Sequence, residues 1–160
     1  MTKKEYKKIF SKSDWDIESL GIIFDLIDKK GKEWLKLDCY PNQFEIVSAD
    51  QILNLYSSVG LPTNYPHWKF GKDYMTNQNK YLNGKMGLTY EMVLNTNPCI
   101  SYNIEENDLC LMTLVYAHAG QGHNSFFKNN YMFKDWTQAD SIVNYMKFAR
   151  NFILDCEKKY

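Results

Sequence analysis

The stretch DLCLMTLVYAHAG, residues 108–120, decides the fold, because it is apolar on nearly every side. A helix that is apolar all round lies in the middle of a core rather than on the surface. Asn107 directly precedes the stretch and belongs to the residue types that cap helix N-termini. The sequence therefore predicts a buried central helix that begins after Asn107 and has no solvent side.

The segment before this helix changes from helical to strand periodicity. Ile100, Tyr102 and Ile104 alternate with polar residues, as expected of a half-buried strand. The sequence NTNP at residues 95–98 favours a turn, so residues 90–94 should form the partner strand. We therefore expect a β-hairpin that packs against the central helix.

Two capping signatures mark further helices. SDWD begins at Ser13 and precedes an apolar stripe that stops at Gly31, and SADQ begins at Ser48 and precedes a stripe that stops at Gly60. Another helix is expected within residues 69–88. Together with the hairpin, these elements predict a mostly helical α+β fold.

The last helix has the clearest pattern. Thr137 is its expected cap, and no stop signal occurs before Tyr160. We expect this helix, the helix at Ser48 and the central helix to pack around the hairpin. Its apolar stripe consists of Ile142, Tyr145, Met146, Ala149, Phe152, Ile153 and Cys156.

Composition excludes several classes of function. The 160 residues suit one domain, residues 1–160, and 19 basic residues balance 19 acidic ones, so no overall field attracts nucleic acid. Arg150 is the sole arginine, which further disfavours phosphate or guanine recognition. Four cysteines without a CxxC pair, and no signal peptide, indicate a cytoplasmic protein. No apolar run is long enough for a membrane span.

The stretch HAGQGHNSFF, residues 118–127, contains two of the three histidines. On a regular helix, His118 and His123 would point about 140° apart and could not share a metal ion. Gly120 and Gly122 lie between them, and a π-bulge or kink is common at such positions. We therefore expect an irregularity at residues 120–122 that turns both imidazoles to one side.

Other residues could complete a site, although each has a structural alternative. His67 lies among aromatic residues, which suits either a core or the wall of a pocket. Glu91 occupies an apolar strand, and Glu45 has a similar setting. A buried carboxylate near imidazoles is typical of a ligand or general base, whereas a solvated carboxylate or a core histidine bonded to a carbonyl is the common alternative.

Four long motifs carry a resemblance to a known family: YPNQFE at residues 40–45, GLPTNYPHWKFGK at 60–72, YEMVLNTNPC at 90–99 and AHAGQGHNSFFKNN at 117–130. In order and spacing they resemble the SpoVR family, named for stage V sporulation protein R. The resemblance implies a bacterial or phage-encoded protein linked to spore cortex formation or a related stress or envelope process. It places family motif positions at His67, His118, His123, Glu45 and Glu91 without giving them roles.

The chain resembles only the N-terminal part of the much longer family members. We therefore expect it to be a fragment or a short version, whose final helix presents apolar surface that longer relatives cover. Such a surface predicts self-association or a partner protein.

Two classes of function fit these residues. In the first, His67, His118 and His123 are candidate ligands of a divalent metal such as zinc, Glu91 is the candidate catalytic carboxylate, and the reaction is hydrolase-like. In the second, the protein is a non-catalytic scaffold or regulator, and the same residues form a structural polar core.

Overall fold

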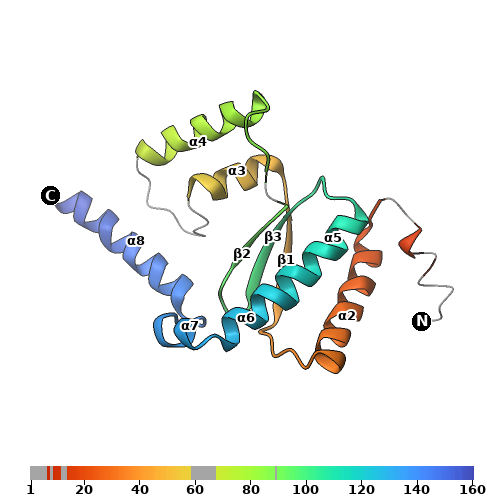
Figure 1. Ribbon diagram of the computed structural model, residues 1–160. Helices are drawn as coiled ribbons and strands as arrows, with labels where there is room; N and C mark the ends of the chain where they lie inside the picture. Colours follow the sequence, from red (N-terminus) through yellow and green to blue (C-terminus); the bar gives the residue numbers. More distant parts are fainter. Residues whose placement is uncertain (1–6, 8, 12–13, 59–67, 89) are drawn as a thin grey trace.

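The computed structural model describes the chain except residues 1–6, 8, 12–13, 59–67 and 89. A three-stranded sheet lies at its centre (Figure 1), made of β1 (Asn42–Val47), β2 (Glu91–Leu94) and β3 (Cys99–Ile104). β3 is the middle strand, antiparallel to β2 and parallel to β1. The expected hairpin is confirmed, and the parallel strand β1 was not predicted.

Most of the described residues are helical and a small sheet lies among them (Figure 1), so the expected α+β class is confirmed. The helix pair α5 and α2 lies on one side of the sheet in Figure 1, with α3 and α4 at its upper end. No helix within the described ranges is long and apolar enough to cross a membrane. The helices are α2 (Ile17–Trp34), α3 (Ala49–Ser57), α4 (Trp68–Leu82), α5 (Leu109–Tyr116), the π-helix η1 (Ala117–His123), α6 (Asn124–Asn129), α7 (Tyr131–Trp136) and α8 (Ile142–Lys159).

Capping explains where the first helices begin. Ser48 and Gln51 form the expected capping box of α3, and Gln51 Oε1 accepts from the Ser48 backbone N–H at 2.9 Å. α2 begins after Asp16, whose carboxylate accepts from the Ser19 N–H at 2.7 Å. The expected cap Ser13 lies outside the described residues.

The central helix begins one residue later than predicted. Asp108 is its N-cap and accepts from the Leu111 N–H at 2.7 Å. Asn107 instead donates its amide to the Tyr90 carbonyl at 3.0 Å, and its own carbonyl accepts from Trp15 Nε1 at 2.8 Å. The prediction was wrong because Asn107 is engaged in tertiary contacts that local sequence does not reveal.

The prediction that Thr137 caps the last helix was also wrong. Thr137 ends the short helix α7, and α8 begins at Ile142 after Ser141. α8 extends away from the sheet (Figure 1) and has no buried residue. It therefore does not pack around the hairpin as expected.

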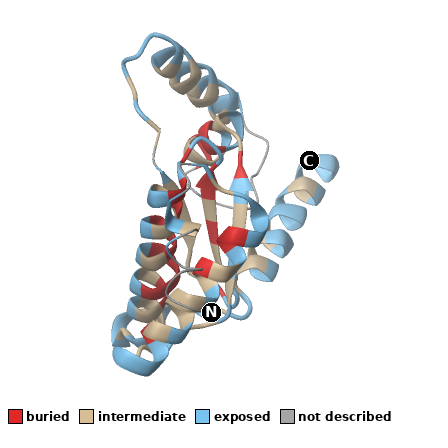
Figure 2. Cartoon of the chain, turned by 90° about the vertical axis from the view of Figure 1, so that its right-hand side faces the viewer, coloured by how far each residue is buried: buried red, intermediate tan, exposed pale blue. Residues whose placement is uncertain are grey.

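The core lies between the sheet and the helices α2 and α5, where Figure 2 shows the buried residues concentrated. Leu20 and Ile23 of α2 pack against Leu109 and Met112 of α5. At the other end of the sheet, a second cluster is formed by Val47, Ile52 and Ile104. The central helix is thus buried on this side of the molecule.

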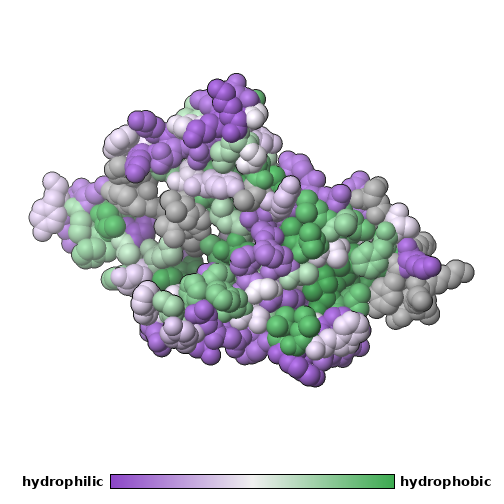
Figure 3. Space-filling view, in the orientation of Figure 1, coloured by the Kyte–Doolittle hydropathy of each residue, from purple (hydrophilic) through white to green (hydrophobic). Residues whose placement is uncertain are grey.

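The expectation that the central helix has no solvent side was wrong. Cys110 is exposed, and Leu114 is 65% exposed. In Figure 3, apolar surface gathers over α5 and α2. The described residues therefore leave one apolar face of α5 in contact with water.

We expect the exposed stripe of α8 to drive self-association, because Tyr145 and Phe152 are 66% and 62% exposed on one helix. Replacing both with lysine should weaken association at least about tenfold, since apolar area no longer leaves water on contact. Light scattering coupled to size exclusion measures this, with Lys147→Gln as control. A wild-type chain that stays a monodisperse monomer at high concentration contradicts the prediction.

Candidate metal centre

The helix that carries both histidines changes its winding at Ala117. From there to His123 it is a π-helix, and the Asn124 backbone N–H donates to the Ala119 carbonyl five residues earlier. In a π-helix, residues five apart lie one turn apart on the same side. The ring centroids of His118 and His123 are accordingly 4.5 Å apart. The expected irregularity is confirmed, and it extends over the whole segment rather than only residues 120–122.

One of the two glycines explains how η1 approaches the sheet. A Cβ at Gly120 would lie 3.2 Å from Nδ2 of Asn42 on β1, closer than nearly all ordinary Cβ contacts. A Cβ at Gly122 would meet no atom within 4 Å. The close approach to β1 therefore accounts for Gly120, and nothing in the structure accounts for Gly122.

Glu91 reaches the histidine pair from β2. Its Oε1 lies 3.3 Å from Nε2 of His118. One ligand atom each from Glu91, His118 and His123 lies within 4.8 Å of the other two. The fold thus brings three possible metal ligands together. One is a carboxylate at the start of β2, and the other two are imidazoles one turn apart in η1.

Partial burial shifts the pKa values of two groups in this cluster. Burial raises the pKa of Glu91, and the nearby His118 opposes that rise. Burial also lowers the pKa of His123, and His118 lowers it further. At neutral pH the lowered pKa keeps His123 as a neutral imidazole, which is the form that binds metals.

The cluster matches the donor set of a mononuclear metal site. Two ligands at 2.0–2.1 Å from a tetrahedral zinc lie about 3.3–3.4 Å apart, which the His118–Glu91 contact already satisfies. The third ligand atom lies within 4.8 Å of the other two, so it needs to move by at most about 1.5 Å to reach the same separation. Two imidazoles and one carboxylate leave a tetrahedral ion one open position for water or substrate.

Gln121, which lies in η1 between the two histidines, anchors the π-helix to α2. Its Nε2 donates to Asp28 Oδ1 at 2.6 Å, and the Tyr116 hydroxyl donates to both carboxylate oxygens at 3.0 Å. Burial raises the pKa of Asp28, whereas these two hydrogen bonds lower it. Gly31 makes room for Gln121, because a Cβ there would overlap its Oε1.

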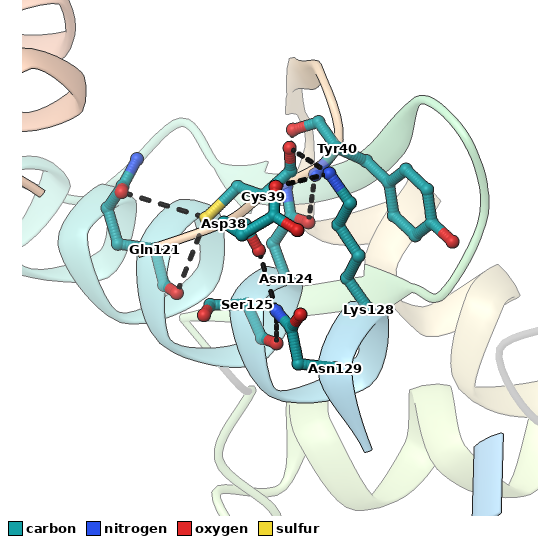
Figure 4. Close-up of polar contacts among 8 residues, drawn as sticks. All are labelled: Asp38, Cys39, Tyr40, Gln121, Asn124, Ser125, Lys128 and Asn129. Carbon is teal, nitrogen blue, oxygen red and sulfur yellow. Dashed lines mark hydrogen bonds and ion pairs between the residues drawn. The ribbon is translucent and has the colours of Figure 1, made fainter. Parts of the chain in front are cut away.

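A second anchor lies on the other side of η1, where α6 contacts the segment before β1 (Figure 4). The Asn124 amide accepts from the Tyr40 N–H and donates to the Tyr40 carbonyl, both at 2.8 Å. Lys128 Nζ bonds Asp38 Oδ1 at 2.6 Å, and Asn129 donates to the Asp38 carbonyl. The polar run after His123 is therefore occupied by contacts within the chain.

The remaining candidate residues do not join the cluster in the described structure. His67 lies outside the described residues. Glu45 pairs in register with Tyr102, whereas Glu91 pairs with Asn103. Successive strand residues point to opposite faces, so Glu45 and Glu91 lie on opposite faces of the sheet.

Sequence reasoning missed the residues that hold η1. Asp28 and Asn124 occupy unremarkable positions in a helix and a polar run, and their partners are more than 80 residues away in the chain. Gly31 is the one residue whose type points to such a contact, and its sequence context predicted only that the helix ends there. The helix in fact continues through Gly31 to Trp34.

Comparison with known proteins supports the family resemblance that the four sequence motifs carry. The family model described as "SpoVR like protein" matches residues 14–160. A protein of Escherichia coli strain K12, named "Uncharacterized protein YcgB", is 47% identical over 157 residues, which are 98% of this chain and 31% of that protein. No solved structure matches the chain.

Fold and site together define the class of this protein. It is an α+β protein in which a small mixed sheet and a π-helix bring two histidines and a carboxylate together. The chain belongs to the SpoVR family. It spans about 31% of the length of the Escherichia coli relative.

We expect Gly31→Ala to destabilise the protein, because the added Cβ displaces the Gln121 amide from Asp28. A hydrogen bond to a charged group contributes about 1.5–3 kcal/mol, which exceeds the roughly 1 kcal/mol that alanine gains over glycine in a helix. The free energy of unfolding, measured by urea denaturation, should therefore fall by about 1 kcal/mol.

Gly21→Ala is the matched control in the same helix, since a Cβ there meets nothing within 4 Å. It should raise the free energy of unfolding by up to about 1 kcal/mol. Equal stabilisation by both substitutions would show that the Gln121 contact contributes little.

Proposed function

We propose that this chain binds a divalent metal ion, zinc being the first candidate, through Glu91, His118 and His123, and that the site is hydrolase-like. The observation that carries the proposal is the convergence of three ligand atoms within 4.8 Å from two separate elements. Zinc in such a site activates a water molecule and polarises a carbonyl oxygen. A purely structural core would not need to bring these three side chains together.

The surroundings of the cluster support ligation over a structural role. The His118 side chain is 60% exposed, so burial does not require a partner for it, and the Glu91 side chain is 17% exposed. Glu91 pairs with His118, which lowers the pKa of Glu91, yet burial is the larger effect and raises that pKa, which favours the neutral carboxyl over a charged pair. A metal ion supplies the positive charge that compensates a buried carboxylate.

Glu91 has two possible roles in such a site. As the third ligand it completes the two-histidine set, and as a free carboxylate it serves as general base beside the ion. Its 3.3 Å distance to His118 Nε2 supports ligation, and we assign it that role. His67 is then available as a further ligand or as a residue near the substrate.

The process is proposed from the family alone. The SpoVR family is named for a sporulation protein, and we place this chain in spore cortex formation or a related bacterial envelope or stress process in the cytoplasm. The alternative is a non-catalytic scaffold, in which the cluster binds no ion.

Zinc binding to untagged protein tests the proposal. Competition with a chromophoric chelator should give one zinc per chain, and His118→Ala and His123→Ala should each weaken zinc binding at least about tenfold, because loss of a supporting second-shell partner alone costs 10–100-fold. His67→Ala measures whether that residue is also a ligand. Wild-type protein that binds no zinc, and retains no other divalent metal by elemental analysis, overturns the proposal.

Glu91→Gln should have different effects on the stability of the metal-free protein and on its affinity for zinc. Because burial raises the pKa of Glu91, its contribution to stability is present below the unfolded pKa and is lost as the pH rises through the folded value. At neutral pH the ionised carboxylate therefore costs stability in the metal-free protein. The substitution should leave that stability equal or higher while weakening zinc binding.

Urea unfolding of the metal-free protein at pH 7, with zinc titration alongside, measures both quantities. Glu45→Gln is the matched control, since it removes a carboxylate from the opposite face of the same sheet. Unfolding of the Glu91→Gln protein at clearly lower urea would indicate a structural ion pair instead of a ligand.

A further inference from the structure

A cavity of about 600 Å³ opens beside the candidate metal centre, between α5 and the residues that lead into β2. Its size lies within the 300–1,000 Å³ typical of pockets for small molecules. The residues that line it are Leu88, Tyr90, Glu91, Leu111, Leu114, Val115 and His118.

The polar groups of this cavity lie together at the metal centre. Glu91 and His118 belong to the three-residue cluster, and the Tyr90 hydroxyl is the other polar side-chain group among the described lining residues. The rest of the wall is leucine and valine. No lysine or arginine lines the described part, so no cationic side chain there complements a phosphate.

The apolar wall is a continuous stripe of the central helix. Leu111, Leu114 and Val115 precede His118 by seven, four and three residues, which places all four on one face of a helix. Leu114 is 65% exposed and Tyr90 is 59% exposed. The exposed Leu114 lies one turn before His118 on this stripe, so the open side of α5 leads directly to an imidazole of the cluster.

We propose that this cavity binds a small amphipathic molecule, whose apolar chain or ring lies along α5 and whose carboxylate or carbonyl head group reaches the metal centre. The inference rests on the proposed function, because the metal ion supplies the contact for the head group. It adds the substrate class: an acyl compound with an apolar tail, in preference to a nucleotide or a sugar phosphate.

Two probes with the same head group test this. Acetohydroxamate and octanohydroxamate both bind zinc through the hydroxamate, and they differ only in the length of the apolar chain. Calorimetry on zinc-loaded protein should show that octanohydroxamate binds at least about tenfold more tightly, because its chain leaves water on binding.

Leu114→Asn removes part of the apolar wall without adding a charge or a strong metal ligand. It should reduce the preference for octanohydroxamate at least about threefold. Leu82→Asn is the matched control, since Leu82 is 73% exposed at the end of α4 and does not line the cavity. The control should keep the full preference.

The outcomes separate the two proposals. If the protein binds zinc but the two hydroxamates bind equally, the substrate class is overturned while the metal site stands. If Leu114→Asn keeps the full preference, the chain binds elsewhere and the inference is overturned. If the protein binds no zinc, the proposed function fails, and this inference fails with it.

Discussion

The π-helical turn between His118 and His123 is the constraint on which the candidate site depends. A regular α-helix would separate the two imidazoles by about 140°, and Glu91 could then meet one of them but not both. Winding the segment Ala117–His123 as a π-helix places the rings 4.5 Å apart. π-helical turns are rare and often occur at functional sites, so this local deviation is itself an argument for function.

A π-helix needs support from its surroundings, because regular α-helical winding is the default for such a segment. Here the support comes from both sides. Gln121 bonds Asp28 of α2 in the space that Gly31 leaves, and Asn124 bonds the backbone at Tyr40. With this winding both amides are hydrogen-bonded, so these contacts tie η1 and α6 to α2 and to the segment before β1.

Two apolar surfaces are exposed in the described structure, and one of them borders the candidate site. The apolar face of α5 and the stripe of α8 are both exposed, although they lie on different parts of the molecule. The chain spans 31% of the length of its Escherichia coli relative. Coverage of either surface by further chain or by a partner protein stays a prediction.

Local patterns in the sequence predicted a large part of this fold. The turn at residues 95–98, the alternation in β3 and the capping box at Ser48 all act over a few residues, and the structure has the predicted elements there. The spacing of His118 and His123 around Gly120 also indicated the irregular winding. Each of these features depends on contacts between near neighbours, which the sequence displays directly.

Only the tertiary structure decided which elements meet. The parallel pairing of β1 with β3 joins residues 57 positions apart, and no local pattern in either strand specifies the partner. Asn107 resembled a cap but bonds Tyr90, and the stripe of α8 resembled a core face but has no described partner that buries it. The sequence by itself predicted the irregular histidine pair and named Glu91 as a candidate beside it. The packing of η1 on β2 decided that Glu91 reaches His118, because a carboxylate 27 residues earlier in the chain approaches an imidazole only when the strand and the helix pack together.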